Sequence, residues 1–306
     1  MLDGLWRKYK ESNVAGRFIF INVAIFVLSL LIGVFCKLFN TPSFASELLS
    51  WLELPADPDV LIRRPWTLFT YMFMHGGLFH LLWNMLALYV FGKIFLNFYS
   101  IRHFIGVYLW GGLFGALFFV AAYNLFPYFS PMKHSAALVG ASAAVLAIVV
   151  AAAVRSPEYR IRLLFIGSVK LSTFALVTVA ISFLLLAGDN AGGNFAHIGG
   201  AFIGWLLASL LGRGHDVASA VLKPYDWTCT FFGWIRGLFK RSNRGSKKKK
   251  GNFSYTKSSR TQDYEYNARK KADEAEIDRL LEKIKKGGYA SLTDEEKKRL
   301  FDASSK

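Results

Sequence analysis

Four polar side chains that could do chemistry stand inside otherwise apolar stretches of the sequence: Ser142, His197, His80 and Asn84. A serine hydroxyl becomes an effective nucleophile when a general base takes its proton, and a neutral imidazole suits that task. Ser142 is therefore a candidate nucleophile, with His197 as its general base and acid in a catalytic dyad. His80 and Asn84 are spaced i and i+4 on one helical face, where their donors can form an oxyanion hole with the backbone N–H of Ser142.

Each of these residues also has a structural explanation when it is taken alone. A serine in the run Gly140-Ala141-Ser142-Ala143-Ala144 suits close helix packing, Asn84 could bond across helices, and His80 could sit at an interface with a water. Strongly polar groups in apolar spans are costly, so their combination is more informative than any one of them. No carboxylate lies in these stretches to orient the histidine, which favours a dyad over a triad that uses Asp189.

Membrane-spanning helices are the elements that must position these residues. The chain of 306 residues is 53% hydrophobic and 16% aromatic, which is typical of a membrane protein. A spanning helix needs about 20 apolar residues, and six stretches qualify, at residues 18–39, 78–99, 103–126, 137–154, 171–187 and 195–211. We therefore predict an all-α membrane protein with six transmembrane helices. Because residues 1–17 are polar and no cleavage site follows the first span, we expect that span to stay as an anchor.

The basic residues predict how these helices are oriented. Lys and Arg accumulate at the cytoplasmic ends of spans, and here they lie before the first span, between the second and third, between the fourth and fifth, and after the sixth: Arg7, Lys8, Lys10, Arg17, Lys93, Arg102, Arg155, Arg160, Arg162, Lys170 and Arg213. Both termini are therefore predicted to be cytoplasmic. Spans two, four and six then begin at the outer face, so the four polar residues share one depth, within about two turns of that face.

The chain divides into a membrane body and a basic tail. Residues 240–306 contain 20 of the 37 Lys and Arg residues. We expect a cytoplasmic segment (1–16), a six-helix membrane domain (17–213), an interfacial amphipathic segment (214–240), a basic linker (241–272) and a small helical tail (273–306). The connection 40–77, with its tryptophans and Arg63-Arg64, is predicted to be partly helical and to lie in the headgroup layer.

The tail carries two local signals. Lys247–Lys250 is predicted to contact anionic lipid, or else to be a solvated linker that reinforces orientation. Thr293-Asp294-Glu295-Glu296 is typical of a capping box that opens a short helix. The two cysteines, Cys36 and Cys229, have no metal-ligand spacing. We expect no disulfide framework, metal or cofactor, and no nucleic-acid partner.

Taken together, the polar motifs resemble those of the rhomboid family of intramembrane serine proteases. The matching residues are His80-Leu81-Leu82-Trp83-Asn84, Gly140-Ala141-Ser142, and Ala196-His197-Ile198-Gly199-Gly200 with Gly204, over about residues 17–213. The resemblance implies a six-helix core, water reaching the dyad from the outer side, and hydrolysis of peptide bonds in or near substrate membrane helices. It also implies that the connection 40–77 is embedded in the membrane, and that the fifth helix and the loop after it form a gate and cap.

Three residues depart from the family pattern. Ala143 replaces a glycine after the serine, Thr67 follows Trp66 where many members have arginine, and Leu146 replaces a tyrosine on which some members stack the catalytic histidine. We therefore expect a slightly narrowed approach to Ser142 and a different means of orienting His197. No catalytic atom is removed by these changes.

Two other functions fit the polar cluster less well than a protease does. One is a non-proteolytic rhomboid-like binder or chaperone of membrane proteins, which recognises its substrate without cutting it. The other is a small transporter with a proton relay, for which we find neither clear inverted repeats nor broken helices. A bacterial inner membrane is the expected location of the protease.

Overall fold

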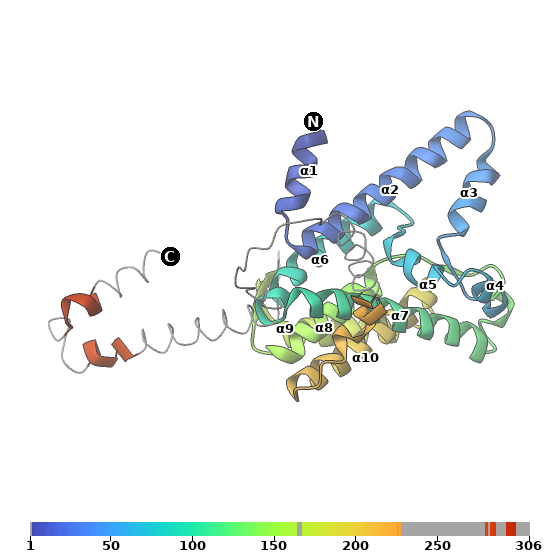
Figure 1. Ribbon diagram of the computed structural model, residues 1–306. Coiled ribbons are helices and arrows are strands. Elements are labelled where there is room, and N and C mark those ends of the chain that lie inside the picture. The colour runs from blue at the N-terminus through green and yellow to red at the C-terminus, as the bar shows by residue number, and fades with distance from the viewer. Residues whose placement is uncertain are drawn as a thin grey trace, which may run out of the picture. The chain divides into compact units, whose positions relative to one another are not determined.

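The computed structural model describes residues 2–163, 167–224, 226–227, 279–280, 282–285 and 292–297. The chain forms two compact units, Met1–Leu238 and Phe239–Lys306. The first unit is built mostly of helices (Figure 1). Its four long apolar helices are long enough to cross a membrane, and they are α2 (Val14–Leu38), α6 (Leu78–Phe98), α7 (Ile101–Leu125) and α10 (Ala191–Gly212). Two shorter apolar helices are α8 (Ser142–Arg155) and α9 (Leu171–Leu184).

These six helices lie where the six apolar stretches predicted them, with shifted ends. Capping explains two of the starts, because the side chain of Asn13 accepts a hydrogen bond from the backbone N–H of Gly16 before α2, and Ser100 caps α7 through the N–H of His103. The fourth stretch was predicted to begin at residue 137, but α8 begins at Ser142. Residues Ala137–Leu138 form a strand instead, and Gly140, with a φ of 129°, lies between that strand and the helix.

The structure is mostly helical rather than all-α, because two small antiparallel sheets join parts of the loops. Strand β1 (Leu54–Pro55) pairs with β2 (Ala137–Leu138), with Leu54 opposite Leu138. Strand β3 (Arg160–Leu163) pairs with β4 (Gly167–Lys170) in a hairpin between α8 and α9. The β1–β2 pair holds the first long connection beside the segment that leads into α8.

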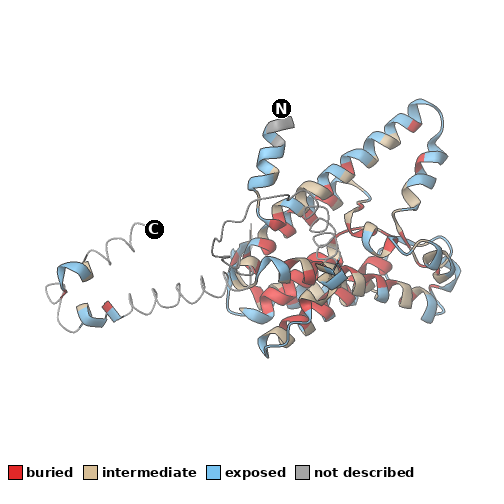
Figure 2. Cartoon of the chain, in the orientation of Figure 1, coloured by how far each residue is buried: buried red, intermediate tan, exposed pale blue. Residues whose placement is uncertain are grey.

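Helix α8 is the centre of the first unit. It contacts α6, α7, α9 and α10, and almost all of its residues are buried, whereas few residues of α2 are buried and most described residues of α1 (Leu2–Glu11) are exposed (Figure 2). With 14 residues it is about 21 Å long, shorter than a hydrocarbon core of about 30 Å. Its neighbours α6, α7 and α10 are longer, so they can extend past its end and leave room for a cavity there.

Glycines let α10 approach α8 closely. A Cβ added to Gly200 would lie 2.2 Å from the carbonyl oxygen of Ala143, and one added to Gly204 would lie 2.4 Å from that of Ala147. Gly115 of α7 makes room for Ala143 in the same way, because a Cβ added to Gly115 would lie 2.6 Å from the methyl carbon of Ala143. Gly200 and Gly204, one turn apart, thus form the face of α10 that packs on α8.

The connection 40–77 is partly helical, as predicted. It contains α3 (Pro42–Ser50), α4 (Pro58–Arg63), α5 (Thr67–Thr70) and the 3-10 turn η1 (Tyr71–Phe73). Trp51 and Trp66 stack with ring centroids 5.9 Å apart, and the guanidinium of Arg64 lies 4.1 Å over the Trp51 ring. Thr67, at the position where arginine was expected from the resemblance, is buried and donates to the carbonyl of Arg64.

Asp57 joins this connection to the loop between α7 and α8. Its buried carboxylate accepts a hydrogen bond from the N–H of Asp59, which caps α4, and lies 2.7 Å from Nδ1 of His134. The backbone hydrogen bond from Asp59, followed by the contact with His134, lowers the pKa of Asp57 below its usual range. A depressed pKa means that the ionised carboxylate stabilises the fold at every pH above its unfolded value of about 3.9.

Replacing Asp57 by alanine is expected to lower the melting temperature at pH 7, because both the cap and the contact with His134 are lost. This deficit should shrink as the pH falls through the folded-state pKa of Asp57, where the native protein loses the same contribution. Melting in detergent at pH 7, 4 and 3 measures it, with the exposed Asp59→Ala as control. An equal deficit at pH 7 and pH 3 would contradict the role of the ionised carboxylate.

The segment after α10 packs under the start of α7. The 3-10 helix η3 (Ala218–Leu222) lies so close to Gly106 that an added Cβ there would be 2.0 Å from the carbonyl oxygen of Ala218. His103 Nε2 lies 3.4 Å from the carboxylate of Asp216, and Arg102 forms an ion pair with Asp226. Of the predicted interfacial segment 214–240, residues 225 and 228–240 lie outside the described residues.

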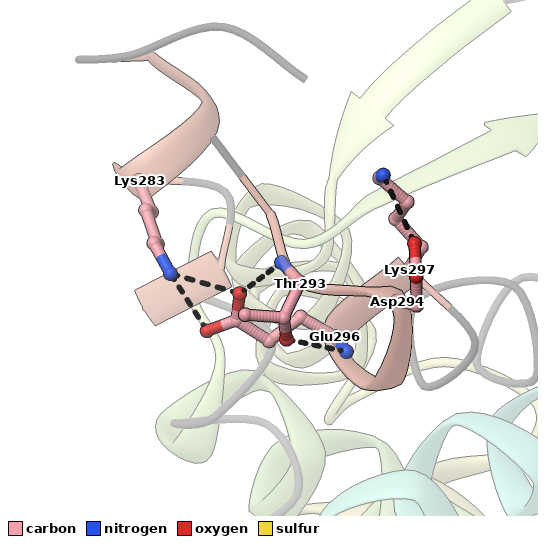
Figure 3. A network of polar contacts seen from close by, with 5 residues as sticks. All are labelled: Lys283, Thr293, Asp294, Glu296 and Lys297. Atoms are coloured by element: carbon pink, nitrogen blue, oxygen red, sulfur yellow. Dashed lines mark hydrogen bonds and ion pairs between the residues drawn. The ribbon is translucent and has the colours of Figure 1, made fainter. Parts of the chain in front are cut away.

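The second unit contains the predicted capping box. Figure 3 shows its polar network, in which the N–H of Thr293 donates to the carboxylate of Glu296 at 2.8 Å and the N–H of Glu296 donates back to the Thr293 hydroxyl at 3.3 Å. Lys283 binds the same carboxylate at 2.8 Å. The capping-box prediction is confirmed. The predicted linker 241–272, with Lys247–Lys250, and Cys229 lie outside the described residues.

Candidate active site

A cavity of about 320 Å³ opens beside the N-terminal end of α8. All four residues selected from the sequence line it, with Ser142 from α8, His197 from α10, and His80 and Asn84 from α6. The remaining lining is mostly apolar: Trp83, Ala87, Phe91, Leu138, Val139, Val145, Leu146, Val149, Phe174, Thr178, Asn190 and Gly193. A largely apolar cavity with a few convergent polar groups is the usual form of a substrate site.

Ser142 is the first residue of α8. The first intrahelical bond runs from the N–H of Val145 to the carbonyl of Ala141, so the backbone N–H groups of the first turn, including that of Ser142, have no partner within the helix. They give this end of α8 a partial positive charge. A negative charge that develops near the Ser142 hydroxyl would therefore be stabilised by the start of its own helix.

Gly140 brings His80 beside Ser142. A Cβ at Gly140 would lie 2.8 Å from both Cε1 and Nε2 of His80 and 3.7 Å from Oγ of Ser142. The imidazole ring thus rests against the Gly140 backbone, close to the serine hydroxyl. Gly140 is held there by its N–H, which donates to the carbonyl of Tyr71 at 3.0 Å.

A Gly140→Ala variant is expected to lose activity for two reasons. Its φ of 129° is strained for any residue with a Cβ, and the new methyl group would displace the His80 ring. We expect the catalytic rate to fall by about 10- to 1,000-fold, as when one oxyanion donor is removed. The matched control is Gly76→Ala, whose Cβ would meet only a methyl group of Val139 at 3.9 Å. Equal rates in the two variants would show that His80 need not lie there.

Asn84 and His80 are held together on α6. The side-chain amide of Asn84 is buried and donates to the carbonyl of His80 at 2.8 Å. An amide nitrogen has two N–H groups, so Asn84, which lines the cavity, keeps a second donor beyond this bond. His75, which sequence reasoning did not select, has its ring 5.1 Å from that of His80. The only sequence signal for it was a second histidine five residues before His80, across Gly76-Gly77.

The hydrogen bond of His197 is made to another serine. Nδ1 of His197 lies 3.1 Å from Oγ of Ser182 on α9, and Ser182 is buried and does not line the cavity. Among the described residues, no hydrogen bond joins Ser142 to His197. Catalytic hydrogen bonds are often long without substrate and tighten when it binds. Among the described residues, the imidazole of His197 is thus hydrogen-bonded to Ser182, while Ser142 and His197 line the same cavity.

The departures from the family pattern leave the cavity open. The methyl group of Ala143 faces Gly115 of α7, and Ala143 is not among the cavity-lining residues, so the expected narrowing of the approach to Ser142 does not occur. Leu146 lines the cavity. The hydrogen bond of His197 is with the hydroxyl of Ser182 on α9, and not with a group on α8. Asp189 is exposed and does not line the cavity.

The fold and site define a class of protein: a membrane bundle of apolar helices with a cavity at the end of its central helix, lined by serine, histidine and asparagine. Comparison with protein families agrees with this description. Residues 63–214 match the model of the Rhomboid domain, and residues 260–306 match a family of unknown function, DUF6576. None of the curated proteins compared with the chain matches it. The chain contains a rhomboid domain and is an integral membrane protein.

Proposed function

We propose that the protein is an intramembrane serine endopeptidase, which hydrolyses peptide bonds in or near transmembrane segments of other proteins. The observation that carries the proposal is the cavity in which Ser142, His197, His80 and Asn84 meet at the N-terminal end of α8. The rhomboid match supports it, because that family includes serine proteases.

The residues divide the reaction between them. The Ser142 hydroxyl attacks the scissile carbonyl carbon while His197 takes its proton, and the resulting oxyanion accepts hydrogen bonds from the Ser142 backbone N–H, His80 and Asn84. The tetrahedral intermediate collapses when His197 gives the proton to the leaving amine. A water then attacks the acyl-enzyme with His197 again as base, the bond to Ser142 breaks as His197 returns the proton to Oγ, and the second fragment leaves with a new carboxyl group.

The membrane setting defines the substrate class. The lining of the cavity is mostly apolar, and the helices that line it expose large apolar side chains such as Leu82 of α6 and Leu176 and Val177 of α9. A transmembrane protein substrate in the bilayer can therefore reach the site without crossing water. We further propose cytoplasmic termini and a cavity that opens toward the outer face, since Lys and Arg gather at the opposite ends of the spans. A bacterial inner membrane and an anionic lipid contact of Lys247–Lys250 belong to the same proposal.

Cleavage in proteoliposomes tests this function. Purified protein is reconstituted with a fluorescent reporter that carries one transmembrane segment, and fragments are identified by mass spectrometry. We expect cleavage by the wild type and by Ser29→Ala, whose hydroxyl bonds only within α2, and none by Ser142→Ala. A folded wild type that binds the reporter without cutting it would favour the alternative, a non-proteolytic binder or chaperone.

A further inference from the structure

The contact between α9 and α10 contains a polar pair that the proposed reaction does not yet use. Oγ of Ser182 lies 3.1 Å from the carbonyl oxygen of Thr178, one turn earlier on α9, and 3.1 Å from Nδ1 of His197 on α10. The Ser182 residue is only 4% exposed. The two contacts therefore form in a buried site where an unpaired polar group would be costly.

The single proton of the Ser182 hydroxyl decides how this pair is bonded. A carbonyl oxygen only accepts, so the contact with Thr178 is favourable when the hydroxyl proton points to that oxygen. The remaining lone pairs of Oγ then accept, and the contact with His197 requires a proton on Nδ1. The opposite choice, with the hydroxyl donating to Nδ1, would set two oxygens 3.1 Å apart with no proton between them.

We propose that Ser182 is a positioning residue for His197: its hydroxyl oxygen accepts a hydrogen bond from Nδ1–H and leaves the lone pair on Nε2 for the proton of Ser142. The inference rests on the proposed function for the role of His197 as base. A carboxylate performs this orienting task in soluble triads. Here a neutral hydroxyl does so, which avoids the cost of an ionised carboxylate among apolar helices.

Position excludes Ser182 as the nucleophile. It lies within α9 (Leu171–Leu184), where the backbone N–H groups are used by the helix itself, so no backbone donor is available for an oxyanion. It also does not line the cavity. Ser142 has both the free first-turn N–H groups and the access that Ser182 lacks.

The tautomer of His197 tests the inference without a substrate. In protein labelled with 15N-histidine, the resonances of His197 are identified by comparison with His197→Ala. We expect the neutral ring of the wild type to carry its proton on Nδ1, and Ser182→Ala to shift the population toward the Nε2–H form. A wild-type ring protonated on Nε2, or a Ser182→Ala ring that stays fully on Nδ1–H, would overturn the assignment.

Kinetics supply a second readout. Ser182→Ala is expected to lower kcat by about 10- to 100-fold, the range for a buried donor left without its acceptor, with KM unchanged because Ser182 does not touch the cavity. Ser182→Thr, which keeps the hydroxyl, should restore most of kcat. Ser29→Ala is the matched control, since it removes the same type of bond to the carbonyl four residues earlier, far from His197 in sequence. A Ser182→Ala variant with wild-type kcat would overturn the inference.

The two proposals fail in different ways. If the wild type cleaves nothing but its His197 carries the proton on Nδ1 and loses it in Ser182→Ala, the proposed function fails, while the assignment of Ser182 as acceptor of the Nδ1–H bond stands. If the wild type cleaves the reporter and Ser182→Ala changes neither kcat nor the tautomer, the positioning role fails and the function stands.

Discussion

Replacing His197 by alanine is expected to lower the rate of reporter cleavage by about 10⁴- to 10⁶-fold, which is the effect of removing the base from a serine hydrolase. Without the imidazole, the Ser142 hydroxyl loses the base that we propose for it, since His80, which lies against the backbone of Gly140, is assigned to the oxyanion hole. Single-turnover cleavage in proteoliposomes measures the loss, and melting in detergent checks that the variant is folded.

His215→Ala is the control for this variant, because His215 is exposed and follows α10. We expect its cleavage rate to equal that of the wild type. Appreciable turnover by a folded His197→Ala protein would remove His197 from the reaction, and the proton would then need another acceptor.

Replacing Gly200 by alanine is expected to have the largest effect on stability. The new Cβ would lie 2.2 Å from the carbonyl oxygen of Ala143 and 2.8 Å from its carbonyl carbon, and backbone atoms cannot rotate away as a flexible side chain can. The two helices must separate, at a cost of about 1–3 kcal/mol in the free energy of unfolding. Because Ala143 follows Ser142, the same shift should move the nucleophile and reduce cleavage.

Gly212→Ala provides a matched comparison at the end of the same helix. A Cβ there would meet nothing within 4 Å, so we expect unchanged stability or a small gain from the higher helix propensity of alanine. Equilibrium unfolding in mixed detergent compares the two variants. Equal stabilities would show that α8 and α10 are not in close contact at Gly200.

The sequence predicted the helices well because their apolar length is a local property. The starts of α6 at Leu78 and α9 at Leu171 agree with the predicted spans. The start of α8 was missed because the pairing of Leu54 with Leu138 joins segments far apart in the sequence, and hydropathy carries no sign of such a pair. Hydropathy also did not predict η3, because its position depends on a long-range contact with Gly106 of α7.

The site residues also divide into those that a local pattern reveals and those that depend on contacts between distant segments. Ser142, His80 and His197 could be selected because polar groups in apolar spans are costly, so each demanded an explanation. Ser182 could not, because a serine that bonds to the carbonyl one turn earlier needs no other partner. Its contact with His197 depends on how α9 lies against α10. The capping box at Thr293 was predictable, since all its partners lie within four residues.

The most direct measurement of the central claim is the identity of the serine that reacts. The detergent-solubilised protein is labelled with a fluorophosphonate, which forms a stable bond with an activated serine hydroxyl, and the modified peptide is identified by mass spectrometry. We predict the label on Ser142 and its absence from both Ser142→Ala and His197→Ala. A label on Ser182, or a folded wild-type protein that takes up no label, would contradict the account.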